Sequence, residues 1–351
     1  MNHNTPLPPA SPRTPRRLSH DGRRHVLTAA QLRSHGVSPA EATEQCRPGG
    51  PWQQLLPGVF MLHQGPPTSE ERLHAVLLYA ARELPESAGV PVQPEADGPH
   101  RPMYREAMIT GLAALTLHGF TSAPALSALE RIDVLVPRLR RLRSTGCAHI
   151  VRTSSLPAPE QATGLPVAPV PRALADAVAE LTDSGAVLRL LCEAVRGGYC
   201  EPAAVVRELT HAKLLTRPHV VDAVDSLLAE GRAIAEDRLY RMVTAYGLPD
   251  PVWNVDLRLP GGPHLGGLDA YWPEQAVAVE LDTRAPRQDE DAMWSEYARK
   301  REHLERLGIT VVHITPRKLR DAMEQQAAVV RTALMASGDR DPAAYVVVLP
   351  R

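Results

Sequence analysis

The sequence predicts a mixed α/β protein of several domains, an α+β arrangement in which helices and strands share each domain. The chain has 351 residues, more than one ordinary hydrophobic core holds, so two or three domains are expected. Apolar residues make up 44% of it and charged residues 23%, which is the composition of a folded chain. Short apolar runs typical of strands occur between longer patterns of helical spacing, which is why both element types are expected.

Charge and hydropathy exclude several classes of protein. The formal net charge is −1, so any affinity for nucleic acid must come from local basic patches. No apolar run reaches the ~18 residues of a membrane-spanning helix, and residues 1–24 lack the apolar segment of a secretory signal. The four cysteines form no C-x-x-C pair, which argues against a zinc site or a disulfide scaffold. We therefore expect a cytoplasmic protein without a membrane partner.

The N-terminal elements follow from proline content and capping motifs. Residues 1–17 are rich in proline and arginine and are expected to form a disordered basic tail. Thr28 with Gln31 makes a capping box, whose side chains satisfy free backbone N–H groups at a helix start, and predicts a helix over 29–34. Ser38 with Glu41 makes a second box and predicts a helix over 39–46.

A β-hairpin is predicted next, with strands over 52–56 and 59–63 joined by Pro57-Gly58. Helix, tight turn, helix and hairpin is the element order of a winged helix-turn-helix, which we assign to residues 18–65. A winged helix binds DNA through its second helix or serves as a protein-interaction module, and both alternatives stay open at this point.

Residues 66–230 are expected to form a mixed α/β middle domain. Thr68 with Glu71 makes a third capping box, which predicts a helix up to about Leu84. The proline-rich residues 85–103 show no periodicity and predict a surface insertion. A helix over 107–117, strands over 132–136 and 149–152, and helices from 172 to 229 with breaks at Gly197-Gly198 and Pro218 are expected to follow.

Residues 231–351 predict a third domain with the element order αβββαβα. A helix over 233–246 ends at Gly247 and is followed by strand-like runs over 252–259, 265–271 and 276–281. A charged helix near 291–307, an apolar strand over 309–315 and a final long helix that begins at Pro316 complete the order.

Three carboxylates in this last domain predict a metal centre. Asp269 ends the second run and Glu280 lies in the third, so the turn between them can bring both to one end of a sheet, where Glu236 can join them. Such oxygen ligands suit Mg²⁺ or Mn²⁺, which activates water for phosphodiester hydrolysis. Each acid also has an alternative interpretation. Glu236 suits the dipole at the start of its helix, and Asp269 suits the cap of a turn. The buried Glu280 can be satisfied by a cation or by a substrate-facing cleft.

The order and spacing of Asp269 and Glu280-Leu281-Asp282 resemble the D…(D/E)-x-K core of PD-(D/E)XK nucleases. With the segments 247–254, 268–273, 277–282 and 307–315, residues 232–337 resemble the actinobacterial branch related to very-short-patch-repair endonucleases. The resemblance implies a restriction-endonuclease-like fold, with Glu236, Asp269 and Glu280 as metal ligands and Asp282 at the position of the superfamily's lysine. Lys300 would supply a migrated positive charge, or lies on the surface of a mixed-charge helix. Residues 283–287 lack the glycine and histidine pair usual in this branch, which predicts reduced or no cleavage.

The segments 27–38, 49–60 and 108–119 resemble the AbiEi-type antitoxins of type IV toxin–antitoxin systems, over about residues 25–215. The resemblance implies a winged helix that binds operator DNA and represses its own transcription. It also implies a cognate toxin or self-association as a further partner.

Two basic stretches agree with contact to double-stranded DNA. Residues 13–47 hold seven arginines against three acidic residues, and residues 131–152 hold six arginines against Asp133. The DNA-contact candidates are Arg23, Arg24, Arg33, Gln45, Arg47, Arg138, Arg140, Arg141 and Arg143.

We expect a DNA-binding regulator with a nuclease-like C-terminal domain of reduced or no activity. The alternatives are an active Mg²⁺-dependent endonuclease that the winged helix delivers to DNA, and an antitoxin or scaffold that acts through protein contacts.

Overall fold

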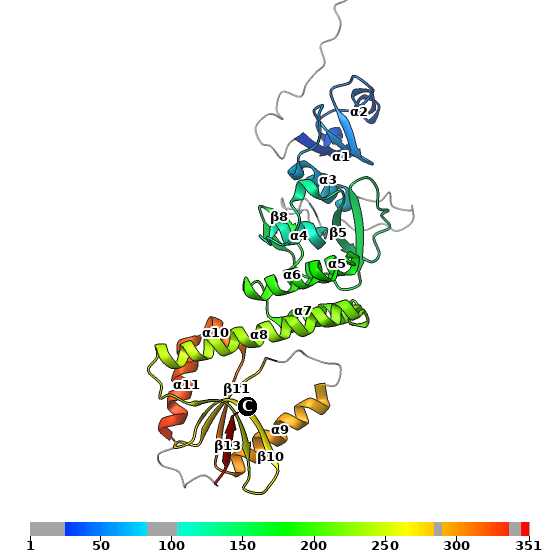
Figure 1. The fold of residues 1–351 in the computed structure, drawn as a ribbon. Helices are drawn as coiled ribbons and strands as arrows, with labels where there is room; N and C mark the ends of the chain where they lie inside the picture. The colour runs from blue at the N-terminus through cyan, green and yellow to red at the C-terminus, as the bar shows by residue number, and fades with distance from the viewer. Residues whose placement is uncertain (1–24, 83–103, 105, 284–289, 337–344, 351) are drawn as a thin grey trace, which may run out of the picture. The chain divides into compact units, whose positions relative to one another are not determined.

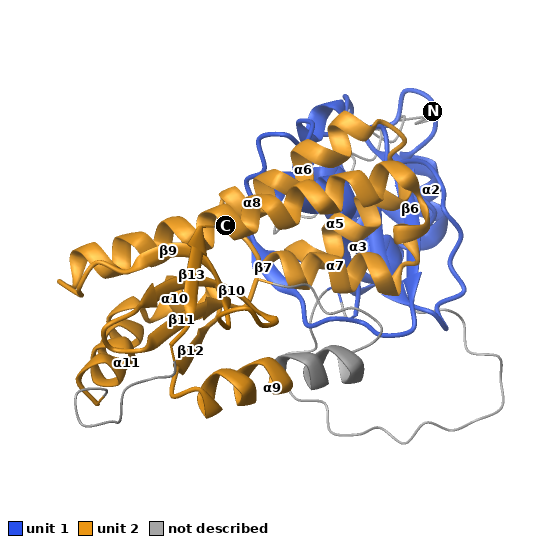
Figure 2. Cartoon of the chain, turned by 60° about the horizontal axis from the view of Figure 1, so that its bottom comes forward, with its two compact units in different colours: residues 1–169 blue, residues 170–351 orange. Residues whose placement is uncertain are grey.

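A computed structural model describes residues 25–82, 104, 106–283, 290–336 and 345–350. Figure 1 shows the fold, and the chain divides into two compact units, residues 1–169 and 170–351 (Figure 2). The predicted basic tail, the predicted insertion at 85–103, Arg23 and Arg24 lie outside the described residues. No helix in the described part of the chain is both long and apolar enough to cross a membrane.

Unit 1 begins with two short helices and a three-stranded antiparallel sheet of order β1-β3-β2. Both predicted capping boxes are confirmed, because Thr28 and Gln31, and likewise Ser38 and Glu41, exchange side-chain and backbone hydrogen bonds. The predicted hairpin is present as β2 and β3, and a strand before the first helix, β1, was not predicted. The elements are β1 (Val26–Thr28), α1 (Ala29–Ser34), α2 (Pro39–Gln45), β2 (Gln53–Leu56) and β3 (Val59–Met61).

Helix α3 (Ser69–Ala81) connects the two sheets of unit 1, since it packs against β1, β3 and β5. Its side chains are buried from Leu73 to Ala81, and its capping box of Thr68 with Glu71 is confirmed. The second sheet has the order β6-β5-β4-β8-β7, with β5 and β6 parallel. Its strands are β4 (Met108–Thr110), β5 (Ile132–Pro137), β6 (Ala148–Thr153), β7 (Glu160–Ala162) and β8 (Leu165–Val167), and α4 (Gly111–Leu117) and a 3₁₀ turn η2 (Leu126–Ala128) accompany them.

The helix predicted over 107–117 is a strand followed by a helix. Residues 108–110 pair with β5 and β8 as β4, and α4 begins only at Gly111. Gly111 has a φ of +61°, and a Cβ there would lie 2.4 Å from Asp133 Oδ2. A residue without a side chain is therefore needed where the strand turns into the helix.

Unit 2 begins with four helices, of which α8 is by far the longest (Figure 1). The predicted breaks at Gly197-Gly198 and Pro218 are both confirmed, because α6 ends at Arg196 and Pro218 is the first residue of α8, where its missing N–H costs no hydrogen bond. The helix predicted over 233–246 is the second half of α8, so the predicted domain boundary at 230/231 falls inside a continuous helix. The elements are α5 (Val170–Glu180), α6 (Ser184–Arg196), α7 (Pro202–His211), the 3₁₀ turn η3 (Leu214–Thr216) and α8 (Pro218–Ala245).

The rest of unit 2 is a five-stranded sheet of order β12-β11-β10-β9-β13 with helices on both faces. One hydrophobic cluster joins the sheet to α8 and α11, and the other joins it to Leu304 of α9. The predicted order αβββαβα is confirmed, with two additions: the last helix is split at Ala322, and β13 closes the sheet edge beside β9. The elements are β9 (Val252–Arg258), β10 (His264–Trp272), β11 (Val277–Leu281), α9 (Glu290–Arg306), β12 (Thr310–Ile314), α10 (Pro316–Asp321), α11 (Met323–Ala336) and β13 (Val347–Pro350).

Candidate functional site

The carboxylates of Asp269 and Glu280 lie where β10 and β11 stop pairing. The ladder between these strands ends at the pair Ala270–Val279, one residue before both acids. Beyond it, Asp269 Oδ2 accepts a 2.6 Å hydrogen bond from the N–H of Leu281, so a carboxylate takes the place of a backbone acceptor. Both side chains are about 5% exposed, which requires partners for their charges.

Two cations of the protein supply those partners, and they come from helices that pack against opposite faces of the sheet. Arg232 of α8 donates from Nη2 to Asp269 Oδ1 and from Nε to Glu236 Oε1, each at 2.7 Å. Lys300 of α9 donates from Nζ to Glu280 Oε1 and to the carbonyl of Gly267, each at 2.8 Å. Each acid of this carboxylate cluster is therefore bound to a fixed positive charge.

Burial and like charges set the protonation of the cluster. Burial raises the pKa of Asp269, the Leu281 N–H and the Arg232 guanidinium oppose that rise, and the charges of Glu236 and Glu280 add to it. Burial lowers the pKa of His313, whose Nδ1 lies 3.8 Å from Glu280 Oε2. The neighbouring Glu280 opposes that decrease, because a carboxylate favours the charged imidazole.

The arrangement does not fit a divalent metal as the side chains stand. Among the residues that the structure describes, no three His, Cys, Asp or Glu groups converge to hold an ion. Arg232 lies between Glu236 and Asp269, where a cation bound by both would stand. Metal binding by Glu236, Asp269 and Glu280 stays a prediction.

Four of the five predicted residues of this domain are brought together, namely Glu236, Asp269, Glu280 and Lys300. Asp282 follows β11, is exposed, and donates its backbone N–H to the carbonyl of Ile314. Sequence reasoning missed Arg232, although its position four residues before Glu236 on a helix is the spacing of an ion pair.

In unit 1, the predicted DNA contacts of the helix–turn–helix differ in how available they are. Arg33 on α1 is exposed. Arg47, just after α2, is also exposed, but its Nη1 lies 2.9 Å from Glu44 Oε1. Gln45 is half-buried, and α2 itself exposes two acids, Glu41 and Glu44. The net positive charge that α2 and its neighbouring residues offer for contact with DNA is therefore smaller than the number of arginines in the sequence suggested.

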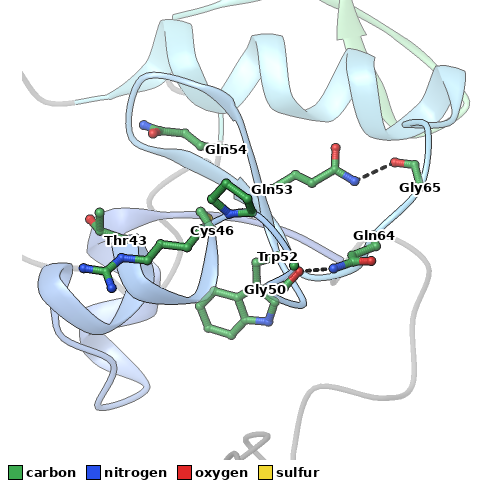
Figure 3. A pocket seen from close by; sticks show the side chains of 11 residues that line it. Thr43, Cys46, Gly50, Trp52, Gln53, Gln54, Gln64 and Gly65 are labelled. Atoms are coloured by element: carbon green, nitrogen blue, oxygen red, sulfur yellow. Dashed lines mark hydrogen bonds between the residues drawn. The ribbon is translucent and has the colours of Figure 1, made fainter.

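A hollow of about 780 Å³ lies between the end of α2 and the hairpin (Figure 3). Amide and indole side chains line it, including Gln53, Gln54, Gln64 and Trp52. Gln53 Nε2 donates to the carbonyl of Gly65 at 2.8 Å, and Gln64 Nε2 donates to that of Gly50, which fixes the open ends of the two strands to the loops beside them. Arg47 also lines the hollow, so this surface offers one charged group among polar hydrogen-bonding groups.

The turn of the hairpin, at Pro57-Gly58, is held by hydrogen bonds to both of its backbone carbonyls. Pro57 O accepts from Arg82 Nη1 at 3.3 Å, and Gly58 O accepts from the N–H of Ala29 at 2.9 Å. The turn is consequently anchored against α3 and the start of α1, because it sits where those helices meet the sheet.

The second basic stretch forms the loop between β5 and β6, residues 138–147, which we call the arginine loop. Arg138, Arg141 and Arg143 are exposed, and within the described part of the chain no hydrogen bond or ion pair engages their guanidinium groups. Arg140 is different: its Nη2 donates to the carbonyls of Ala80 and Arg82 at 2.6 and 2.7 Å. A DNA contact by Arg140 stays a prediction, but its guanidinium already caps the end of α3.

The chain matches no family model and no curated protein sequence.

Proposed function

We propose that this chain is a regulator that binds double-stranded DNA through unit 1, using the helix–turn–helix, the hairpin and the arginine loop. The proposal includes the antitoxin-like role implied by the resemblance of residues 25–215. The observation that carries it is the set of three exposed guanidinium groups on the arginine loop that have no partner among the residues the structure describes, since such arginines are the groups that neutralise phosphates.

The position of the arginine loop supports a single DNA-binding face. Gly146 of this loop approaches β2 so closely that a Cβ on it would lie 3.1 Å from Leu56 Cδ2. Arg82, which follows α3, donates to the carbonyl of Pro57 at the hairpin turn, and Arg140 of the arginine loop donates to the carbonyls of Ala80 and Arg82 at the end of α3. The two segments are therefore neighbours, and one duplex can contact both.

A second candidate function is metal-dependent DNA cleavage by unit 2. The observation that favours it is the contact between Lys300 and Glu280, which places a positive charge beside the acids that the nuclease resemblance designates. Mg²⁺ or Mn²⁺ would supply an activated water and charge neutralisation there, once Arg232 released Asp269 and Glu236.

One experiment tests both candidates: purified protein is incubated with plasmid and with linear duplex in Mg²⁺, Mn²⁺ or EDTA, and binding and cutting are read on the same gels. We expect binding in all three conditions and no cutting. The variant Arg138→Ala/Arg141→Ala/Arg143→Ala should lose binding. Its control, Arg189→Ala/Arg207→Ala/Arg241→Ala, removes the same charge from exposed helix positions in unit 2 and should retain it.

Metal-dependent cutting that is lost in Glu280→Ala would establish the nuclease and leave unit 1 a targeting role. An absence of duplex binding by the wild-type protein would contradict the regulator and favour a scaffold that acts on a toxin or on a second copy of itself.

A further inference from the structure

Leu139 is the most exposed large apolar side chain of the described residues, at 90%. Single apolar residues on a surface are ordinary. Leu139 differs because it stands on the arginine loop between Arg138 and Arg141, whose guanidinium groups have no partner within the described ranges, while the other leucine of the loop, Leu142, is buried.

The loop that carries Leu139 is tied to the body of unit 1. Tyr79 Oη donates to the carbonyl of Arg143 at 2.7 Å, and Arg152 donates to the carbonyls of Arg140 and Leu142. Leu142, three residues after Leu139, is 1% exposed and anchors the loop in the core. Before Leu139, the N–H of Arg138 donates to the carbonyl of Thr153 at 2.8 Å, so the backbone is held on both sides of the exposed leucine.

We propose that Leu139 is a wedge that enters the minor groove of duplex DNA and partly unstacks a base step, while Arg138 and Arg141 bind the groove and its phosphates. The proposal rests on the proposed DNA-binding function and adds the groove and the mode of contact. Its chemical basis is the pairing of an apolar side chain with arginines: the narrow minor groove concentrates negative potential, and an apolar wedge opens the stack from that side.

The test uses the full chain and a short A·T-rich duplex that carries 2-aminopurine, a base whose fluorescence rises on unstacking. Wild-type protein should raise the fluorescence on binding. Leu139→Ala should abolish that rise and weaken the affinity about tenfold. It should leave the salt dependence of binding unchanged, because no charge is removed. Leu139→Met should restore the fluorescence rise, and Leu188→Ala, at a position 38% exposed in unit 2, should behave as wild type.

The result that overturns the wedge is salt-dependent duplex binding by the wild type with no fluorescence change, or an equal change in Leu139→Ala. In that case the DNA-binding function still stands. Failure of the wild type to bind duplex at all removes the proposed function and the wedge with it. The wedge is also contradicted if Leu139→Ala binds duplex DNA as the wild type does but loses binding to an acidic protein partner.

Discussion

At the scale of the residue, the side chains that look alike in the sequence have different tasks in the structure. Arg140 and Arg141 are adjacent, yet Arg140 binds two carbonyls at the end of α3 and Arg141 is exposed without a partner among the described residues. Likewise Arg232 and Arg241 lie on one helix, but only Arg232 is paired with a buried carboxylate. Whether an arginine is available to bind DNA phosphates therefore depends on its hydrogen-bond and ion-pair partners in the protein, and not on the number of arginines nearby.

The pairing of Arg232 predicts a stability difference between two arginine variants. Arg232→Ala leaves Asp269 buried with one cation fewer, and we expect a loss of about 2 kcal/mol in the free energy of unfolding. Arg241→Ala removes an exposed ion pair with Asp237 and should cost less than about 1 kcal/mol. Urea denaturation of both variants checks this, and equal losses would show that Arg232 does not stabilise the cluster.

The contact between His63 and Glu71 predicts a pH dependence. The pKa of His63 is raised above its ordinary value of 6.5 by its hydrogen bonds to the Gln64 carbonyl and to Glu71. A raised histidine pKa means that the folded state binds the proton more tightly than the unfolded state does. This contribution to stability is therefore full below pH 6.5 and is lost as pH rises through the folded-state pKa.

Urea denaturation over a pH series should show that decrease in the wild type and a flatter profile in His63→Gln. Parallel profiles for the two proteins would mean that His63 titrates alike in the folded and unfolded states.

At the scale of the element, local signals could be predicted and long-range pairings could not. The three capping boxes depend on residues three apart, so Thr28, Ser38 and Thr68 were enough to place three helix starts. The strands β1, β4 and β13 were missed, because they are three or four residues long and exist only through pairing with distant partners. The helix that contains Glu236 was predicted as two segments, one ending at residue 229 and one over 233–246, whereas α8 runs without a break from Pro218 to Ala245.

The junction of β4 and α4 predicts that two glycines respond differently to the same substitution. Gly111→Ala puts a Cβ against the Asp133 carboxylate and should cost more than about 2 kcal/mol, or prevent folding. Gly36→Ala, at a φ of +82° with open space around it, should cost only about 1 kcal/mol. Thermal unfolding of both variants measures this difference. Equal losses of stability would show that the contact with Asp133 does not restrict the residue at position 111.

At the scale of the whole molecule, the candidate sites were predicted in part. The acids Asp269 and Glu280 could be placed together from the strand order, because an antiparallel pair joined by a short turn fixes which residues face each other. Arg232 could not be placed beside Asp269, since 37 residues separate them. The arginine loop was identified as basic, but its support by Tyr79 and Leu142 depends on packing that sequence does not display.

We propose that Arg138, Arg141 and Arg143, which have no partner in the part of the chain that the structure describes, bind DNA phosphates. The salt dependence of duplex binding tests this claim. Each phosphate contact contributes about 0.9 to the slope of log K against log salt concentration. The variant Arg138→Ala/Arg141→Ala/Arg143→Ala should therefore reduce that slope by about 2.7, while Arg189→Ala/Arg207→Ala/Arg241→Ala leaves it unchanged. Equal slopes for the first variant and the wild type would contradict the claim, because they would show that these arginines release no counterions from DNA.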